Sequence, residues 1–231
     1  MLLEILSRQN SCQKFAKMSI KCLFAQDFRK ILCFTNLLFI FYNNIVACAT
    51  GLKIIFLKKQ MYLRTMTRED KRALTCCFTG HRRIADEYLT VKEILKREVI
   101  RLIEPEGVRY FGAGGAIGFD EICSSIVLEL KEKYPCIRLI LVLPCAEQDK
   151  YWNDEEKAFY KELKAKADKV VYVSKGYTKD CMFRRNRHLV DNSRFCICYC
   201  RKRSGGTAYT MNYALESGLE VVNIYDKINK K

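Results

Sequence analysis

The feature that most constrains the fold is a regular alternation of short apolar runs and longer amphipathic stretches from residue 73 onward. Six runs have the length and composition of β-strands: 73–79, 108–113, 137–144, 170–174, 194–200 and 219–225. Five stretches between them have helical periodicity or helix boundary signals: 86–103, 120–134, 151–168, 179–193 and 206–217. Such βα alternation predicts an α/β, Rossmann-like, three-layer doubly wound domain with a mostly parallel sheet.

The chain changes character near Met61. Residues 1–60 contain no proline and are rich in Phe, Ile, Leu, Asn and Lys, so we expect the folded domain to comprise residues 61–231. Three hypotheses remain for the earlier part: a poorly ordered extension, an artefact of too early a start codon, or a membrane anchor at residues 31–52. That last segment carries no charge and is long enough to cross a bilayer, but its asparagines are costly in hydrocarbon. We therefore favour a cytoplasmic protein, with an anchored cytoplasmic domain as the alternative.

The composition excludes several classes of protein. Hydrophobic residues make up 49% and charged residues 29% of the chain, which excludes collagen-like and fully disordered proteins. The net charge of +15 favours anionic partners such as phosphates, nucleic acid or a membrane surface. No block of like charge marks a nucleic-acid arm, however, so we regard nucleic acid as a poor candidate.

The cysteines are expected to be reduced core residues. Thirteen of them in a long chain without a convincing secretory signal do not suggest a disulfide scaffold. Cys196, Cys198 and Cys200 alternate along one strand, at intervals of about 6.6 Å, which is too wide for one tetrahedral metal. Cys76 and Cys77 point to opposite faces of another strand. We predict core packing for both groups and no metal site.

Small or basic turns follow three of the predicted strands, and the second and third of these turns carry the glycines of two candidate phosphate cradles. They contain the sequences TGHRR (79–83), GAGGAIGFD (112–120) and SGGT (204–207). Ligands of such sheets bind at the carboxyl ends of the strands, where glycines before a helix let backbone N–H groups approach a phosphate. The dinucleotide-binding fingerprint would need glycine at position 117, but the residue there is Ile117. The sequence also contains no P-loop motif. The turns therefore predict a phosphate ligand, but neither an ordinary NAD dehydrogenase nor a P-loop nucleotidase.

Charged residues near these turns complete the candidate site. Asp120 has two interpretations, since it could bind ribose hydroxyls or cap the helix that it opens. Arg184, Arg185 and Arg187 lie close together on one predicted helix. Arg185 precedes Leu189 by one turn on the apolar side, which favours an inward-facing guanidinium suited to forked phosphate contacts.

Five motifs carry a family resemblance: TGHRR, YFGAGGAIGFDEICSSIVLEL, LPCAEQDKYW, MFRRNRHLVDNS and SGGTAYTMNYA. In this order they resemble the YpsA-like branch of the SLOG superfamily over residues 73–225. That superfamily also contains DprA and the Lonely Guy phosphoribohydrolases, and the resemblance implies a Rossmannoid domain that binds nucleotides or nucleotide-derived ligands. It also implies a pocket lined by Gly80, Arg82, the stretch 114–120 with Gly114, Gly115, Gly118 and Asp120, Arg185, Asn186, Asp191, Gly205, Gly206 and Thr207.

Departures from the family pattern bear on catalysis. Arg83 stands where the family usually has proline, and SGGTAYTMN lacks the glutamate that serves catalysis in the phosphoribohydrolases. Only Asp120 could then act as a general acid or base. We predict binding or sensing of a ligand such as ADP-ribose, NAD or a nucleotide, leave enzymatic activity open, and expect no cofactor beyond that ligand. A homo-oligomer is allowed by the sequence.

Two alternative functions remain. The first is N-glycosidic hydrolysis of a nucleoside monophosphate with Asp120 as the catalytic group. The second is DprA-like binding of single-stranded DNA, which is disfavoured because the sequence shows no interleaved aromatic and basic platform.

Overall fold

Six parallel strands form the centre of the domain in the computed structural model, which describes residues 66–229. Their order across the sheet is β4-β3-β2-β1-β5-β6, and every neighbouring pair is parallel. The central strand β1 therefore lies between β2 and β5, where the strand order changes direction. The strands are β1 (Thr75–Gly80), β2 (Tyr110–Ala113), β3 (Arg138–Leu143), β4 (Lys169–Tyr172), β5 (Phe195–Tyr199) and β6 (Glu220–Asn223).

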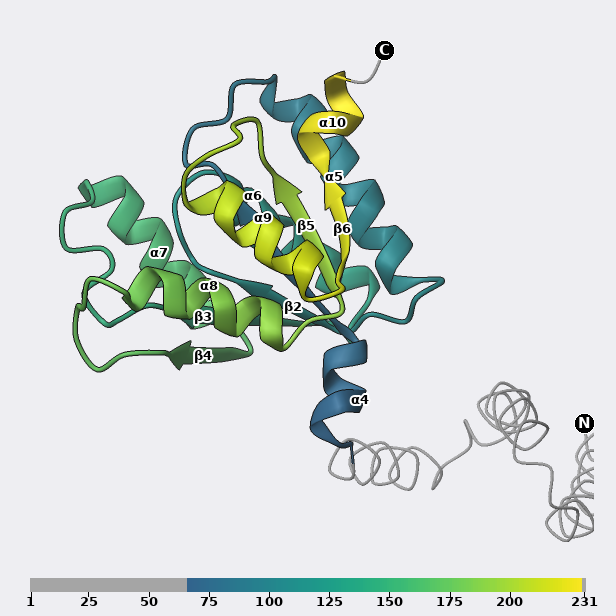
Figure 1. Cartoon of the computed structure of the whole chain (residues 1–231), viewed down its shortest axis with the longest axis horizontal. Coiled ribbons are helices and arrows are strands. Elements are labelled where there is room, and N and C mark those ends of the chain that lie inside the picture. The colour runs from purple at the N-terminus through teal and green to yellow at the C-terminus, as the bar shows by residue number, and fades with distance from the viewer. Residues whose placement is uncertain (1–65, 230–231) are drawn as a thin grey trace, which may run out of the picture. The chain divides into compact units, whose positions relative to one another are not determined.

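Helices cover both faces of this sheet. The helices α5, α6 and α10 pack together on one face, whereas α8 and α9 pack against each other on the opposite face (Figure 1). The predicted three-layer, doubly wound α/β fold is thus confirmed, with a sheet that is parallel throughout. The helices are α4 (Arg68–Ala73), α5 (Tyr88–Ile103), α6 (Phe119–Lys133), α7 (Asp154–Lys166), α8 (Cys181–Asp191), α9 (Gly206–Glu216) and α10 (Ile224–Asn229).

Two short helices differ from the sequence prediction. The run 219–225 was predicted as one strand, but β6 ends at Asn223 and α10 begins at Ile224. An apolar run does not by itself distinguish the end of a strand from the buried side of a following helical turn. The other unpredicted helix, α4, begins after Thr67, whose side chain forms a capping box with Asp70.

The core has two layers, one on each side of the sheet. Cys76 is buried on the side of α5 and α6, while Cys77 is buried on the side of α8 and α9. Cys196, Cys198 and Cys200 share that second layer. The core positions predicted for these cysteines are confirmed.

Burial also determines how these thiols should react. It raises the pKa of Cys76 and Cys198, and a hydrogen bond with Cys77 together with burial raises the pKa of Cys196, so little thiolate forms at pH 8. Cys136 is only half-buried. We expect iodoacetamide to alkylate Cys136 at least about tenfold faster than the strand cysteines, measured by peptide mass mapping over time. Equal rates for Cys136 and Cys196 would contradict the buried positions of the strand thiols.

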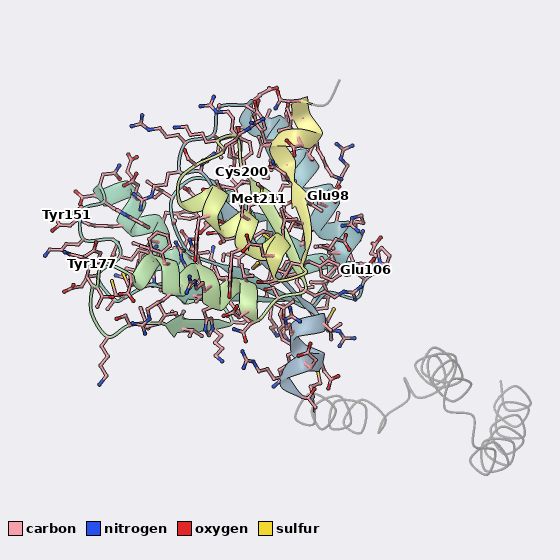
Figure 2. The ribbon with its side chains drawn as sticks, in the orientation of Figure 1. Glu98, Glu106, Tyr151, Tyr177, Cys200 and Met211 are labelled. Atoms are coloured by element: carbon pink, nitrogen blue, oxygen red, sulfur yellow. The ribbon has the colours of Figure 1, made fainter. Side chains whose placement is uncertain are left out.

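The loops after β3 and β4 carry exposed aromatic side chains at the carboxyl edge of the sheet. Tyr151 and Tyr177 are 90% and 66% exposed and extend away from the core (Figure 2).

Among the helices of residues 66–229, none has the length and apolar character needed to cross a membrane. The segment 31–52 lies outside the described residues, as do all residues before 66, so the three hypotheses for that part of the chain stay as they were.

Candidate functional site

A cavity of about 320 Å³ opens at the carboxyl edge of the sheet. It lies at the ends of β1 and β5, the two neighbouring strands between which the strand order changes direction. This is the usual ligand position in open parallel sheets. Four segments line it: the end of β1 with its turn, the glycine loop before α6, the helix α8 and the first turn of α9. The lining residues include Thr79, Gly80, His81, Arg82, Ala116, Asp120, Met182, Arg185, Asn186, Gly206 and Thr207.

A buried ion pair forms one wall of the cavity. The Arg185 Nη1 atom lies 3.6 Å from Oδ2 of Asp120, and the two side chains are only 11% and 8% exposed. Burial raises the pKa of Asp120, and the Arg185 guanidinium opposes that rise; burial in turn lowers the pKa of Arg185. The inward-facing arginine predicted from the helix pattern is therefore Arg185.

Asp120 holds the glycine loop. Its Oδ2 accepts hydrogen bonds from the backbone N–H groups of Gly114, at 3.1 Å, and Ala116, at 3.4 Å. The N-cap position of α6 is Gly118, so the helix-capping interpretation of Asp120 is wrong. The expectation that this loop offers its N–H groups to a phosphate also needs correction, because two of them already donate to a protein carboxylate.

The glycines of this region allow close packing rather than an open cradle. A Cβ at Gly114 would lie 1.3 Å from Nη1 of Arg185, so the guanidinium rests directly on the loop backbone. A Cβ at Gly80 would lie 2.4 Å from the Phe119 ring. Gly118 has a φ of +83° and lies against the backbone of Arg82. These contacts hold the β1 turn, the loop and the start of α6 together around the cavity.

The first turn of α9 is the more open cradle. Its N-cap is Gly205, with a φ of +95°, and a Cβ added at Gly205 or Gly206 would meet nothing within 4 Å. Gly206 and Thr207 line the cavity, where the N-terminus of α9 favours an anion. Asn186 fixes α8 to this helix, because its Nδ2 donates to Oγ1 of Thr210 at 2.8 Å.

Five of the predicted residues are not in the lining of this cavity: Gly114, Gly115, Gly118, Asp191 and Gly205. Gly114, Gly118 and Gly205 lie in the segments around it, whereas Asp191 and Gly115 face other parts of the domain. Asp191 is exposed at the end of α8, where it accepts a hydrogen bond from the hydroxyl of Tyr213 at 2.8 Å, and it does not line the cavity. Gly115 faces the side chains of Tyr160 and Leu143 and lines a second cavity. The sequence pattern gave the chain position of these residues but not the side of the loop or helix.

His81 is a cavity residue that was not predicted as part of the site. Its Nε2 accepts a hydrogen bond from the backbone N–H of Arg201 at 3.1 Å, which joins the β1 turn to the β5 turn. Burial lowers the pKa of His81, with Lys202 and Arg201 adding to the effect, so the ring is neutral at pH 7. Its place between Gly80 and Arg82 in the sequence was the available signal.

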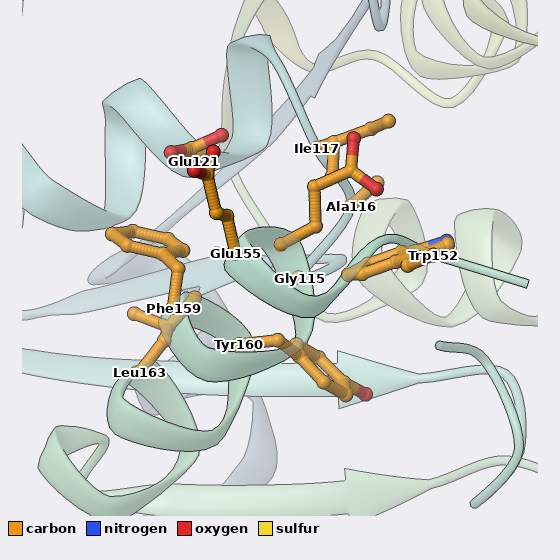
Figure 3. Close-up of a pocket in the computed structure, with 10 residues that line it drawn as sticks. Gly115, Ala116, Ile117, Glu121, Trp152, Glu155, Phe159, Tyr160 and Leu163 are labelled. Atoms are coloured by element: carbon orange, nitrogen blue, oxygen red, sulfur yellow. The ribbon is translucent and has the colours of Figure 1, made fainter. Parts of the chain in front are cut away.

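The second cavity, of about 280 Å³, lies beside the first and shares Ala116 with it. Figure 3 shows aromatic side chains of α7 and of the segment before it around the loop at Gly115. Trp152, Phe159 and Tyr160 provide this aromatic lining. The sequence had predicted only a helix over residues 151–168 for this part of the chain.

An aromatic and basic cluster lies on the surface of α8 and α9. The guanidinium of Arg187 lies 5.9 Å from the ring centroid of Tyr209 and 5.5 Å from that of Tyr213, and the Phe183 ring contacts Tyr209 edge-on. The sequence showed no interleaved aromatic and basic platform, and this cluster, with the single arginine Arg187, is one that the sequence did not indicate. Helix packing brings these residues together from two separate segments.

Comparisons with known proteins agree with the fold and the motifs. The model of the YspA SLOG family matches residues 77–225. The uncharacterized SPbeta prophage-derived protein YoqJ of Bacillus subtilis is 29% identical over 143 residues, which cover 57% of this chain and 84% of YoqJ. A UPF0398 protein of Listeria monocytogenes is 29% identical over 144 residues, which cover 61% of this chain and 78% of the relative.

Solved structures of DprA are more distantly similar. DprA from Streptococcus pneumoniae has a TM-score of 0.46 and 20% identity, and the match covers 64% of this chain and 48% of that one. DprA from Helicobacter pylori, described with a single-stranded DNA binding mode, has a TM-score of 0.46 and 15% identity, over 69% of this chain and 73% of its own.

Proposed function

This chain belongs to the YspA SLOG family, and we propose that its cavity of about 320 Å³ binds the phosphate end of a nucleotide-derived ligand. The observation that carries the proposal is the buried guanidinium of Arg185 beside the open first turn of α9. Its Nε atom is buried and has no hydrogen-bond partner among residues 66–229. A buried donor without a partner is costly, and an anionic ligand in this cavity would offset that cost.

The charge of the cavity supports an anion. Arg82 and Arg185 line it together with a single carboxylate, that of Asp120. The N–H groups at the start of α9 add the positive end of a helix dipole. We assign the phosphate to Arg185, Gly206 and Thr207. Both hydrogen bonds that the Asp120 carboxylate accepts from residues 66–229 end on Oδ2. Its other oxygen, Oδ1, would accept a hydrogen bond from a ribose hydroxyl.

The same geometry favours binding over N-glycosidic hydrolysis. Asp120 is the only carboxylate in the lining of this cavity among residues 66–229, and its Oδ2 is held by the loop and lies 3.6 Å from Nη1 of Arg185. General acid or base catalysis needs a titratable group free to exchange a proton with the substrate. The hydrolase alternative predicts release of free base from AMP with protein in excess, and loss of that release in Asp120→Asn.

Blocking the α9 cradle tests the proposal. We expect AMP, ADP-ribose or NAD to raise the thermal midpoint of the wild-type protein, because a ligand at about 100 times its Kd adds roughly 2.7 kcal/mol of stability. Gly206→Val should weaken that binding at least about tenfold by occupying the approach to the helix N-terminus. Gly176→Val is the matched control, since an added Cβ there also meets nothing within 4 Å and the residue lines neither cavity.

The outcome separates ligand classes. If none of the three ligands shifts the midpoint, or if Gly206→Val binds as tightly as wild type, the proposal fails. A labelled single-stranded oligonucleotide is tested beside these ligands, because the chain has a net charge of +15 and carries the aromatic and basic cluster around Arg187 on α8 and α9. Binding of that oligonucleotide alone, falling steeply with salt, would favour nucleic acid instead.

A further inference from the structure

The second cavity is not used by the phosphate site. It holds about 280 Å³ and adjoins the first cavity at Ala116, which lines both. Ligand pockets usually hold about 300–1,000 Å³, and these two cavities lie at the lower end of that range or just below it, so each suits one end of a nucleotide better than a whole one. A ligand that passes over Ala116 would place its phosphate in one cavity and its other end in the next.

The lining of the second cavity suits a flat aromatic ring. Trp152 and Phe159 are partly exposed and Tyr160 is buried, so the first two present aromatic surface to an entering group. Trp152 packs edge-on against Tyr160 with 5.1 Å between ring centroids, which fixes its orientation. Aromatic side chains of this kind bind nucleobases by stacking, irrespective of sequence.

The charged groups of this lining are all carboxylates. Glu121, Glu155 and Glu156 line the cavity, and none forms a salt bridge within residues 66–229. Their positions in the first turns of α6 and α7 explain how the helices tolerate them. Glu121 and Glu156 also accept hydrogen bonds from the backbone N–H groups of Gly118, at 3.4 Å, and Asn153, at 3.1 Å. The carboxylate of Glu155 accepts none within residues 66–229, so it is the one that remains available to a ligand.

We infer that the second cavity takes the base of the ligand, and that this base carries an exocyclic amino group. This inference rests on the proposed function, since the phosphate is held in the first cavity. An ionised carboxylate only accepts hydrogen bonds, so it pairs with an amino group and repels a carbonyl oxygen. Adenine, guanine and cytosine present such an amino group, whereas uracil and hypoxanthine do not.

Matched nucleotide pairs test the inference on the full chain. The pairs are AMP with purine riboside 5′-monophosphate, GMP with inosine 5′-monophosphate, and CMP with UMP, each measured by calorimetry. The first two pairs differ by deletion of the amino group, and the third by its exchange for an oxygen. We expect the amino-bearing member of at least one pair to bind about tenfold tighter or more, because its partner lacks the hydrogen bond from the amino group to a charged carboxylate.

Variants locate the effect. Of the three lining glutamates, only Glu121 and Glu156 accept hydrogen bonds from residues 66–229, so Glu155→Ala should fold normally. Either this variant or Glu121→Ala should reduce the preference at least about threefold. Glu162→Ala is the control, because Glu162 lies on the same helix, is 59% exposed and is absent from the cavity lining. Its preference should equal that of wild type.

Each result has a distinct meaning. Equal binding within all three pairs, together with loss of binding in Gly206→Val, would overturn the inference and leave the phosphate site intact. A preference that persists in both glutamate variants would overturn the assignment of the base to this cavity. If no nucleotide binds at all, the proposed function and this inference both fail.

Discussion

Replacing Gly118 with alanine is expected to lower the free energy of unfolding by at least about 3 kcal/mol. The residue has a φ of +83°, a conformation that costs a side chain roughly 1–3 kcal/mol. The new Cβ would also lie 2.2 Å from the carbonyl oxygen and 2.8 Å from the Cα of Arg82. These are backbone atoms, so they cannot rotate away, and the β1 turn would have to move off the start of α6.

A matched control separates strain from steric overlap. Gly107 also has a positive φ, of +69°, but a Cβ there would meet nothing within 4 Å. Gly107→Ala should therefore cost only the backbone strain. Urea unfolding of the two variants gives the difference directly. If both lose the same stability, the close approach of Gly118 to Arg82 contributes nothing and the description of the β1 turn is wrong.

The ligand site should respond to the same substitution. Phe119 donates its backbone N–H to the carbonyl oxygen of His81 at 3.2 Å, so the β1 turn and the start of α6 are directly joined. Displacing this turn moves His81 and Arg82 relative to Asp120. The folded fraction of Gly118→Ala should then bind nucleotides less tightly than Gly107→Ala does.

The fold could be predicted from sequence because each element carries its own signal. The apolar runs and the helical periodicity are local, and parallel connection follows from their alternation. The predicted residues that line the cavity came mainly from turns at the carboxyl ends of strands. Asp191 shows the limit of this approach, because its position on the helix, rather than its proximity to Arg185 in the chain, decides which way it faces.

Contacts between distant segments were beyond the sequence. The pairing of Asp120 with Arg185 joins α6 to α8, and the aromatic lining of the second cavity joins α7 to the glycine loop. Periodicity identifies an apolar helix face but does not show whether a neighbour fills the space in front of it. For the same reason the glycine loop was expected to face a phosphate. In the structure the Asp120 carboxylate accepts hydrogen bonds from the loop backbone, and the Arg185 guanidinium packs against Gly114.

Arg185→Met is expected to destabilise the domain by about 3–5 kcal/mol at pH 7, because it leaves the Asp120 carboxylate buried without its counter-charge. Burial already raises the pKa of Asp120, and loss of Arg185 should raise it further. A carboxyl group whose pKa is raised on folding contributes stability at low pH and loses it as pH rises through the folded-state pKa. The loss in free energy of unfolding of Arg185→Met relative to wild type should therefore be smallest near pH 4 and grow toward neutral pH.

Two further variants decide whether the pair is the cause. Arg184→Met removes a neighbouring, exposed arginine whose Nη2 donates to the backbone carbonyl of Val173 at 2.9 Å, so it should cost about 1 kcal/mol or less, without this pH dependence. The double variant Asp120→Asn with Arg185→Met removes the buried charge while an amide oxygen can still accept from Gly114 and Ala116. It should be more stable than Arg185→Met at pH 7, as measured by urea unfolding. A deficit that is constant between pH 4 and pH 8, or a double variant no more stable than the single one, would mean that Arg185 acts through packing and not through the charge of Asp120.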